Sequence, residues 1–295
     1  MKNLIVLALV TILMESCSEH HLFDESLNET CAPQSEQEAS QTSILNSCLE
    51  KARWGDGNTF LDLAKCYHDG IGVKSDFMGT LTMLMMADQY GVADNCVEDY
   101  IMSLPDTDHT KMLFEAIAKL DKKNMLLTDS IVEILTSNGS SDGYALKGII
   151  HVERGDTLGG LEAIQTGAKM GSSFAELLLC AFPTQETNYG KNVNLSMLQN
   201  MSNHSPVASK MLGDIYSGYI NGETSVIDET LAASYYKKAD EQGCLGRRPA
   251  RWLINYYDRN GIKIDNKEME RLQILSGQIK APNELISDSL CVDAE

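Results

Sequence analysis

The residue types that most often carry catalysis occur in this chain, but their spacing argues against an active site. Cys66 and His68 could act as nucleophile and base, yet residues two positions apart on a helix do not share a face. The segment 70–72, Gly-Ile-Gly, lacks the third glycine and the lysine of a phosphate-binding loop. No histidine is followed by glutamate as in the zinc-peptidase helix motif. We therefore predict that the protein is not an enzyme and holds neither a cofactor nor a metal.

Two charged clusters could bind a ligand. Asp106 and Asp108 flank a turn after Pro105, where a hard cation could bind, although a solvated acidic loop explains them better. The basic-aromatic cluster comprises Arg247, Arg248, Arg251 and Trp252. Its guanidinium groups could grip a carboxylate or a sugar acid. The alternative is the start of a helix whose tryptophan packs into the core.

Composition favours helices and excludes a general nucleic-acid binder. The chain has 295 residues, of which 43% are hydrophobic and only 6% aromatic. Its leucine, alanine and methionine content suits helices. The net charge of −18 repels a phosphate backbone, so no nucleic-acid partner is expected.

The N-terminal residues are typical of a targeting segment. Lys2 and the apolar stretch 4–14 predict a signal peptide over residues 1–16, because the stretch is too short to span a bilayer. The small residue before Cys17 resembles the signal of bacterial lipoproteins, which implies lipidation of that cysteine. The alternative is a plain secretory peptide. The following Ser18-Glu19 resembles the acidic tether of surface lipoproteins of the Bacteroidetes. We expect export and a lipid anchor facing the periplasm or the cell surface.

Glycines and aspartates that mark helix ends recur along the rest of the chain. Residues 17–44 are expected to form a polar tether, 45–280 a helical array, and 281–295 a tail. Six helix pairs are expected, whose second helices end near Gly91, Gly139, Gly171, His204, Gly243 and Gly277. This spacing falls within the roughly 20–50-residue period of solenoids. Aspartates placed to cap second helices at their N-termini are Asp76, Asp228 and Asp265.

The helix pairs resemble a known family. The pattern over 63–91 and the run Tyr235–Gly243 resemble Sel1-like repeats, relatives of the tetratricopeptide repeat. The resemblance implies an all-α, right-handed α-solenoid of about six helix-turn-helix repeats. The expected core positions are Leu63, Cys66, Tyr67, Leu81, Leu84, Ala87, Leu212, Tyr216, Leu231, Tyr235 and Ala239. Small residues such as Gly213 would let neighbouring helices approach closely.

The cysteine count leaves pairing open. Of eight cysteines, seven remain if Cys17 carries lipid, and an odd number cannot all pair within one chain. No Cys-x-x-Cys motif occurs. We expect mostly free thiols and one pair at most.

The resemblance implies a protein-protein interaction scaffold or adaptor. Its partner, a protein or peptide, would bind the concave face lined by the first helix of each pair. The candidate binding residues are Lys65, His68, Asp69, Asp214, Ser217, Arg247 and Arg248. One alternative is a glycan or small-ligand receptor. Such a receptor would need aromatic platforms in a groove, and the chain has only two tryptophans. A second is a β-lactam-binding or hydrolysing enzyme of the family's cysteine-rich branch, whose regular cysteine pairs are missing here. A third is a secreted eukaryotic glycoprotein.

Overall fold

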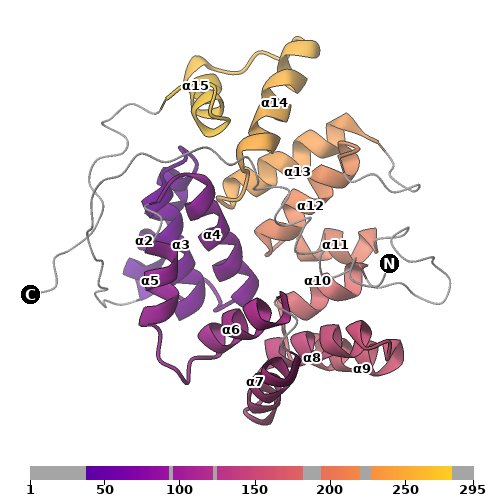
Figure 1. Cartoon of the computed structure of the whole chain (residues 1–295). Coiled ribbons are helices and arrows are strands. Elements are labelled where there is room, and N and C mark those ends of the chain that lie inside the picture. The colour runs from indigo at the N-terminus through magenta and orange to yellow at the C-terminus, as the bar shows by residue number, and fades with distance from the viewer. Residues whose placement is uncertain (1–37, 93–95, 122–124, 182–193, 220–226, 281–295) are drawn as a thin grey trace, which may run out of the picture.

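The fold was analysed in a computed structural model of the chain. It describes residues 38–92, 96–121, 125–181, 194–219 and 227–280. All regular structure within these ranges is helical, which confirms the all-α class. The helices run as a solenoid of antiparallel pairs, each pair packed on the next (Figure 1).

The pairs follow the chain in order. The first three are α3 (Gly57–Asp69) with α4 (Phe77–Gln89), α6 (His109–Asp121) with α7 (Met125–Ser137), and α8 (Ser141–Glu153) with α9 (Thr157–Lys169). The last three are α10 (Ser173–Ala181) with α11 (Leu195–Met201), α12 (Pro206–Tyr216) with α13 (Glu229–Glu241), and α14 (Arg247–Arg259) with α15 (Asn266–Leu275). Two further helices, α2 (Glu38–Ala52) and the short α5 (Cys96–Ser103), lie outside the pairs.

The predicted caps of the second helices are confirmed. The carboxylate of Asp76 accepts the backbone N–H of Gly79 at 2.7 Å, and Asp265 accepts that of Glu268 at 2.7 Å. Asp228 caps α13 in the same way. Left-handed glycines follow five of the second helices, at Gly91, Gly139, Gly171, Gly243 and Gly277.

One boundary differs from the prediction. Helix α2 begins at Glu38 rather than at Leu45, so the last part of the expected tether is helical. Leu45 and Leu49 pack against the core and fix the helix. Extending an existing helix costs far less than starting one, so polar residues upstream can join it.

Most of the expected core is buried. Leu63 and Leu212 are fully buried, and Tyr67 and Tyr216 are nearly so. Leu231 was expected in the core, but it is 39% exposed. It lies in the first turn of α13, where the small side chains of the next two residues face inward instead.

Close packing in the fifth pair depends on a glycine. A Cβ atom added to Gly213 would overlap the ring of Tyr236. The α12–α13 crossing therefore requires the absence of a side chain at this position, as the sequence predicted.

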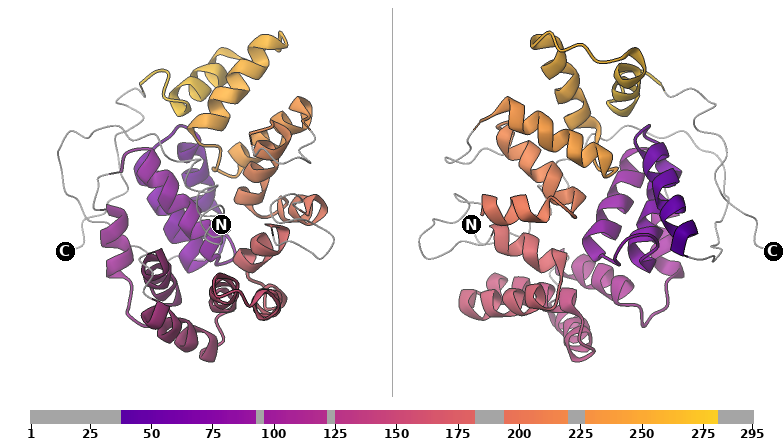
Figure 2. Two further views of the ribbon diagram at one scale, coloured as in Figure 1. Left: turned by 45° about the vertical axis from the view of Figure 1, so that its right-hand side comes forward. Right: turned by 180° about the vertical axis from the view of Figure 1, so that it is seen from behind.

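The array bends until its last pairs return to its first. Helix α4 contacts both α10 and α12, and the views agree in placing α2–α4 against the later pairs (Figures 1 and 2). Arg53 forms an ion pair with Asp240 at 2.9 Å, and the Tyr90 hydroxyl donates to the Leu275 carbonyl at 3.0 Å. The inner face of α12 is therefore packed against the chain's own first repeat, which leaves less of the expected concave surface open.

Candidate functional site: a polar pocket between the first two helix pairs

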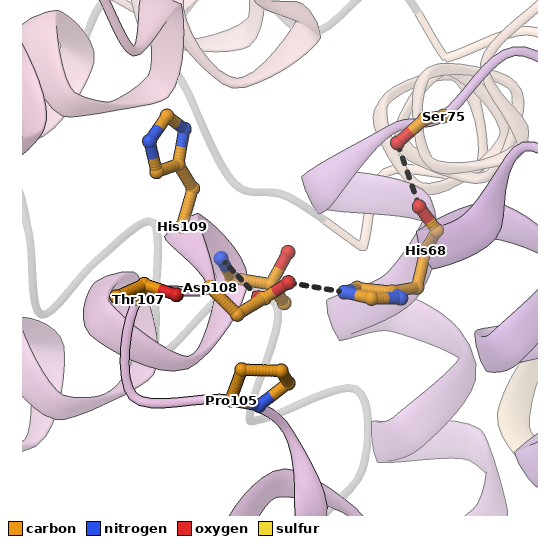
Figure 3. Close-up of a pocket in the computed structure, with 7 residues that line it drawn as sticks. His68, Ser75, Pro105, Thr107, Asp108 and His109 are labelled. Atoms are coloured by element: carbon orange, nitrogen blue, oxygen red, sulfur yellow. Dashed lines mark hydrogen bonds and ion pairs between the residues drawn. The ribbon is translucent and has the colours of Figure 1, made fainter. Parts of the chain in front are cut away.

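A polar pocket lies where the end of α3 meets the loop before α6. Its volume is about 450 Å³. It is lined by His68, Ser75, Pro105, Thr107, Asp108, His109 and Thr110 (Figure 3). Hydroxyl, imidazole and carboxylate groups dominate this lining, so the pocket suits a polar ligand group.

His68 bridges two carboxylates at the pocket. Its Nδ1 lies 2.6 Å from Asp69 Oδ1, and its Nε2 lies 3.1 Å from Asp108 Oδ2 (Figure 3 shows the second contact). The other oxygen of Asp108 caps α6 by accepting the backbone N–H groups of Thr110 and Lys111. Both ring nitrogens of His68 are therefore occupied, and the ring joins the first pair to the second.

Lys111 fixes the loop that carries the pocket's outer wall. Its side chain is buried, and Nζ donates to the carbonyls of Met102 and Leu104 at 3.2 and 2.9 Å. Nζ also bonds Asp106 Oδ1 at 2.7 Å, and this hydrogen bond lowers the pKa of that carboxyl. The cation beside the 105–108 turn is thus the ammonium of Lys111.

Tyr100 packs beside His68. Its ring meets the imidazole edge-on, with 6.3 Å between centroids. The hydroxyl is buried and has no hydrogen-bond partner among the described residues. Burial, followed by the nearby carboxylates Asp69 and Asp108, raises the pKa of this phenol.

A partly buried carboxylate, Asp142, lies outside the pocket lining. Burial raises the pKa of Asp142 to about 6, although the Ser172 hydroxyl hydrogen-bonds it at 2.5 Å. The neighbouring Asp76 raises this pKa further, whereas Lys74 and His109 lower it. The junction of the first pair with α6, α8 and α10 therefore contains a group that titrates close to neutrality.

The expected binding residues have mixed positions. Asp69 is exposed, whereas Lys65 is half-buried and pairs with Asp62 at 3.3 Å. Asp214 was expected to be exposed, but it is 1% exposed. This expectation is wrong because side chains of α13 and α14 cover the carboxylate.

Asp214 is the centre of a buried polar cluster. Its carboxylate accepts hydrogen bonds from Lys210, Arg248 and the Tyr236 hydroxyl at 3.0, 3.2 and 2.8 Å. The Ser217 hydroxyl lies 3.0 Å from that of Tyr236. The structure thus brings together three of the candidate binding residues, Asp214, Ser217 and Arg248. Their polar groups form hydrogen bonds within the protein.

The basic-aromatic cluster is the start of helix α14. Arg248 binds the chain's own Asp214, and the guanidinium of Arg247 lies over the ring of Tyr90 at 5.3 Å. Trp252 stacks on Tyr256, with 5.2 Å between centroids. These contacts therefore favour the start of a helix over an open site that binds the carboxylate of a ligand.

Two groups of packed aromatic rings lie in the last two pairs. Tyr216 stacks on Tyr235 in the first group, and the second comprises Tyr236, Trp252, Tyr256 and Tyr257. The number of tryptophans in the sequence did not indicate these groups. The paired tyrosines at 235–236 and 256–257 were the available signal.

Two nucleophile patterns are structural. The Cys66 thiol is 3% exposed, and its pKa is raised by a hydrogen bond to Cys48 and by burial. Residues 139–143 match the Gly-x-Ser-x-Gly pattern of hydrolases. Here the pattern joins two helices rather than a strand and a helix, and its central serine, Ser141, is the first residue of α8.

The described ranges contain no group of three or more histidine, cysteine or acidic side chains able to hold a metal ion. None of their helices combines the length and the apolar composition needed to cross a membrane. The predicted signal peptide and Cys17 lie outside the described residues.

No model of a known protein family matches the sequence, and no curated protein matches it. Two solved structures are similar in fold. One is a Sel1 repeat protein from Oxalobacter formigenes, with 18% identity, a TM-score of 0.41, and coverage of 76% of this chain and 88% of that one. The other is a protective antigen present in uropathogenic Escherichia coli strains, displaying an SLR fold, with 16% identity and a TM-score of 0.37. That match covers 76% of this chain, which spans 46% of the length of the antigen.

Proposed function

We propose that this protein is a non-enzymatic interaction scaffold that binds another protein at the His68–Asp108 pocket. The pocket is the observation that carries the proposal. It opens on a wall of packed helix pairs whose own polar groups are largely satisfied. A rigid wall with one polar recess can receive a partner's side chain with little loss of conformational freedom.

Charge indicates the chemistry of the partner. Asp69 and Asp108 lie at the pocket, and the exposed carboxylate of Asp106 lies beside it. The whole chain carries a net charge of −18. A lysine or arginine side chain on a basic partner surface fits this arrangement, and long-range attraction would speed association.

The tether belongs to the same proposal. Lipidation of Cys17, after export directed by residues 1–16, would hold the helical array to a bacterial membrane as in lipoproteins. Residues 18–37 would then separate the membrane from α2. The Sel1-like resemblance of the sequence supports a scaffold in such a place.

A receptor for a small polar ligand is the second candidate. The pocket volume of about 450 Å³ lies within the range of small-molecule sites. Such sites are mostly apolar, whereas hydroxyl, imidazole and carboxylate groups line this one, so the protein partner is the better fit.

The test is capture of partners from cross-linked, solubilised membranes. It compares the wild-type chain with Thr107→Arg, which adds bulk and positive charge at the exposed rim of the pocket. Ser234→Arg adds the same charge at an exposed position of α13 and serves as the control. We expect a basic protein to be enriched with wild type and with the control, and at least tenfold less with Thr107→Arg.

Equal enrichment with all three forms would overturn the pocket as the binding site. No enriched protein would overturn the scaffold and favour the small-ligand alternative. In parallel, loss of membrane association in Cys17→Ala is expected, and its retention would contradict lipidation at that residue.

A further inference from the structure

Cys48 and Cys66 are two buried thiols on neighbouring helices. Cys48 lies on α2 and is 5% exposed, whereas Cys66 lies on α3 and is 3% exposed. Their side chains share a hydrogen bond. Both are free cysteines in this structure.

The two helices run alongside each other at this point. A Cβ added to Gly72, just after α3, would meet the backbone oxygen of Gln41 and the Cβ of Leu45 on α2. Residues near the start of α2 therefore lie beside the end of α3, and Cys48 lies further along the same antiparallel contact. The thiol contact belongs to an extended helix interface.

We propose that Cys48 and Cys66 form a disulfide bond that fastens α2 to the first helix pair. In this step the two thiols lose two protons and two electrons, and a Sγ–Sγ bond forms. A second disulfide, either a protein oxidant or glutathione disulfide, takes up the electrons and protons and becomes two thiols.

Packing of α2 against α3 brings the two side chains together as the chain folds. The thiolate is the attacking species in exchange, so one of the two sulfurs attacks the oxidant and forms a mixed disulfide. The other sulfur then displaces the leaving thiol and completes the bridge.

The bond would strengthen the attachment of α2 to the first helix pair. Helix α2 precedes the first pair, and its main helix contact is with α3. It is also the first helix of the described residues, so a pull on the expected tether would reach the described part of the chain at α2. A covalent link would pass that force to the packed array instead of peeling α2 away.

The experiment refolds the reduced full chain in a glutathione redox buffer, which gives the oxidant access before the thiols are buried. Remaining thiols are then alkylated in denaturant. Glu-C and trypsin together release Cys48 within 39–50 and Cys66 within 66–74, each as the one cysteine of its peptide. Mass spectrometry without reduction should find these two peptides linked, with Cys180 alkylated.

Two outcomes would overturn the proposal: both cysteines alkylated, or either one linked to a different cysteine. Thermal unfolding gives an independent readout. Reductant should lower the unfolding temperature of the wild type and of Cys180→Ala by several degrees, and leave that of Cys48→Ala unchanged. An equal response to reductant in Cys48→Ala would also contradict the bridge. Neither readout depends on the partner or on the lipid anchor.

Discussion

Arg53 and Asp240 form an ion pair at 2.9 Å across 187 positions of the sequence. Asp240 also binds Arg271, which donates in turn to Glu268 and to the backbone oxygen of Arg53. The segment after α2, the end of α13 and helix α15 therefore meet at one buried carboxylate. This cluster closes the bent array, and it determines which faces of the helices remain open.

The closure predicts a large effect for Arg271. The Arg271→Met variant should lose about 3–5 kcal/mol of unfolding free energy, because removing one partner leaves Asp240 buried with less compensation. Urea unfolding measures the loss. Arg259→Met is the matched control: Arg259 pairs with Glu229 at 3.1 Å, but its side chain is 56% exposed. That variant should lose at most about 1 kcal/mol, and similar losses in both would contradict a closing role for Arg271.

Leu63 and Leu231 differ in how much of the side chain is buried. Leu63→Ala should cost about 2–5 kcal/mol, because Leu63 is fully buried in the first pair. Leu231→Ala deletes the same atoms from a side chain that is 39% exposed, and should cost well under half as much. Chemical denaturation of the two variants compares them directly. Equal costs would show that α13 buries the face on which Leu231 lies.

The loop before α6 should depend on Lys111. The Lys111→Met variant keeps an aliphatic stem but loses the bonds to Met102, Leu104 and Asp106. Hydrogen exchange should rise in residues 102–108 by at least tenfold while staying unchanged in α12 and α13. Binding of the captured partner should weaken in parallel, because this loop forms one wall of the pocket. Unchanged exchange in the loop would contradict its attachment through Lys111.

Local signals made much of the fold predictable. Asp76, Asp228 and Asp265 each cap a helix with a hydrogen bond that spans only two or three residues, so position alone indicates the role. Glycine in a left-handed turn after a helix is equally local. These features recur in each well-formed repeat, which is why they identified the helix pairs.

Exposure was harder to predict because it depends on distant segments. Asp214 follows the same helical pattern as an exposed polar residue, and it is buried because Tyr236 of α13 and Arg248 of α14 cover it. The pocket was hard to predict for a different reason. His68 and Asp108 were both singled out, but as members of separate motifs. Their contact at 3.1 Å depends on the path of the chain between α4 and α6, where α5 is an additional helix.

Asp142 predicts how stability varies with pH. Its pKa is about 6 in the folded chain, mainly because it is buried, against about 3.9 when unfolded. The folded state therefore binds more protons between these values, and stability falls as pH rises from about 4 to 6. This group should contribute a loss of roughly 2–3 kcal/mol. Asp142→Asn, which can still bond Ser172, should remove that part of the slope and be more stable than wild type at pH 8. Urea unfolding across pH 4–8 measures both, and an unchanged slope in the variant would show that Asp142 is ionised without penalty.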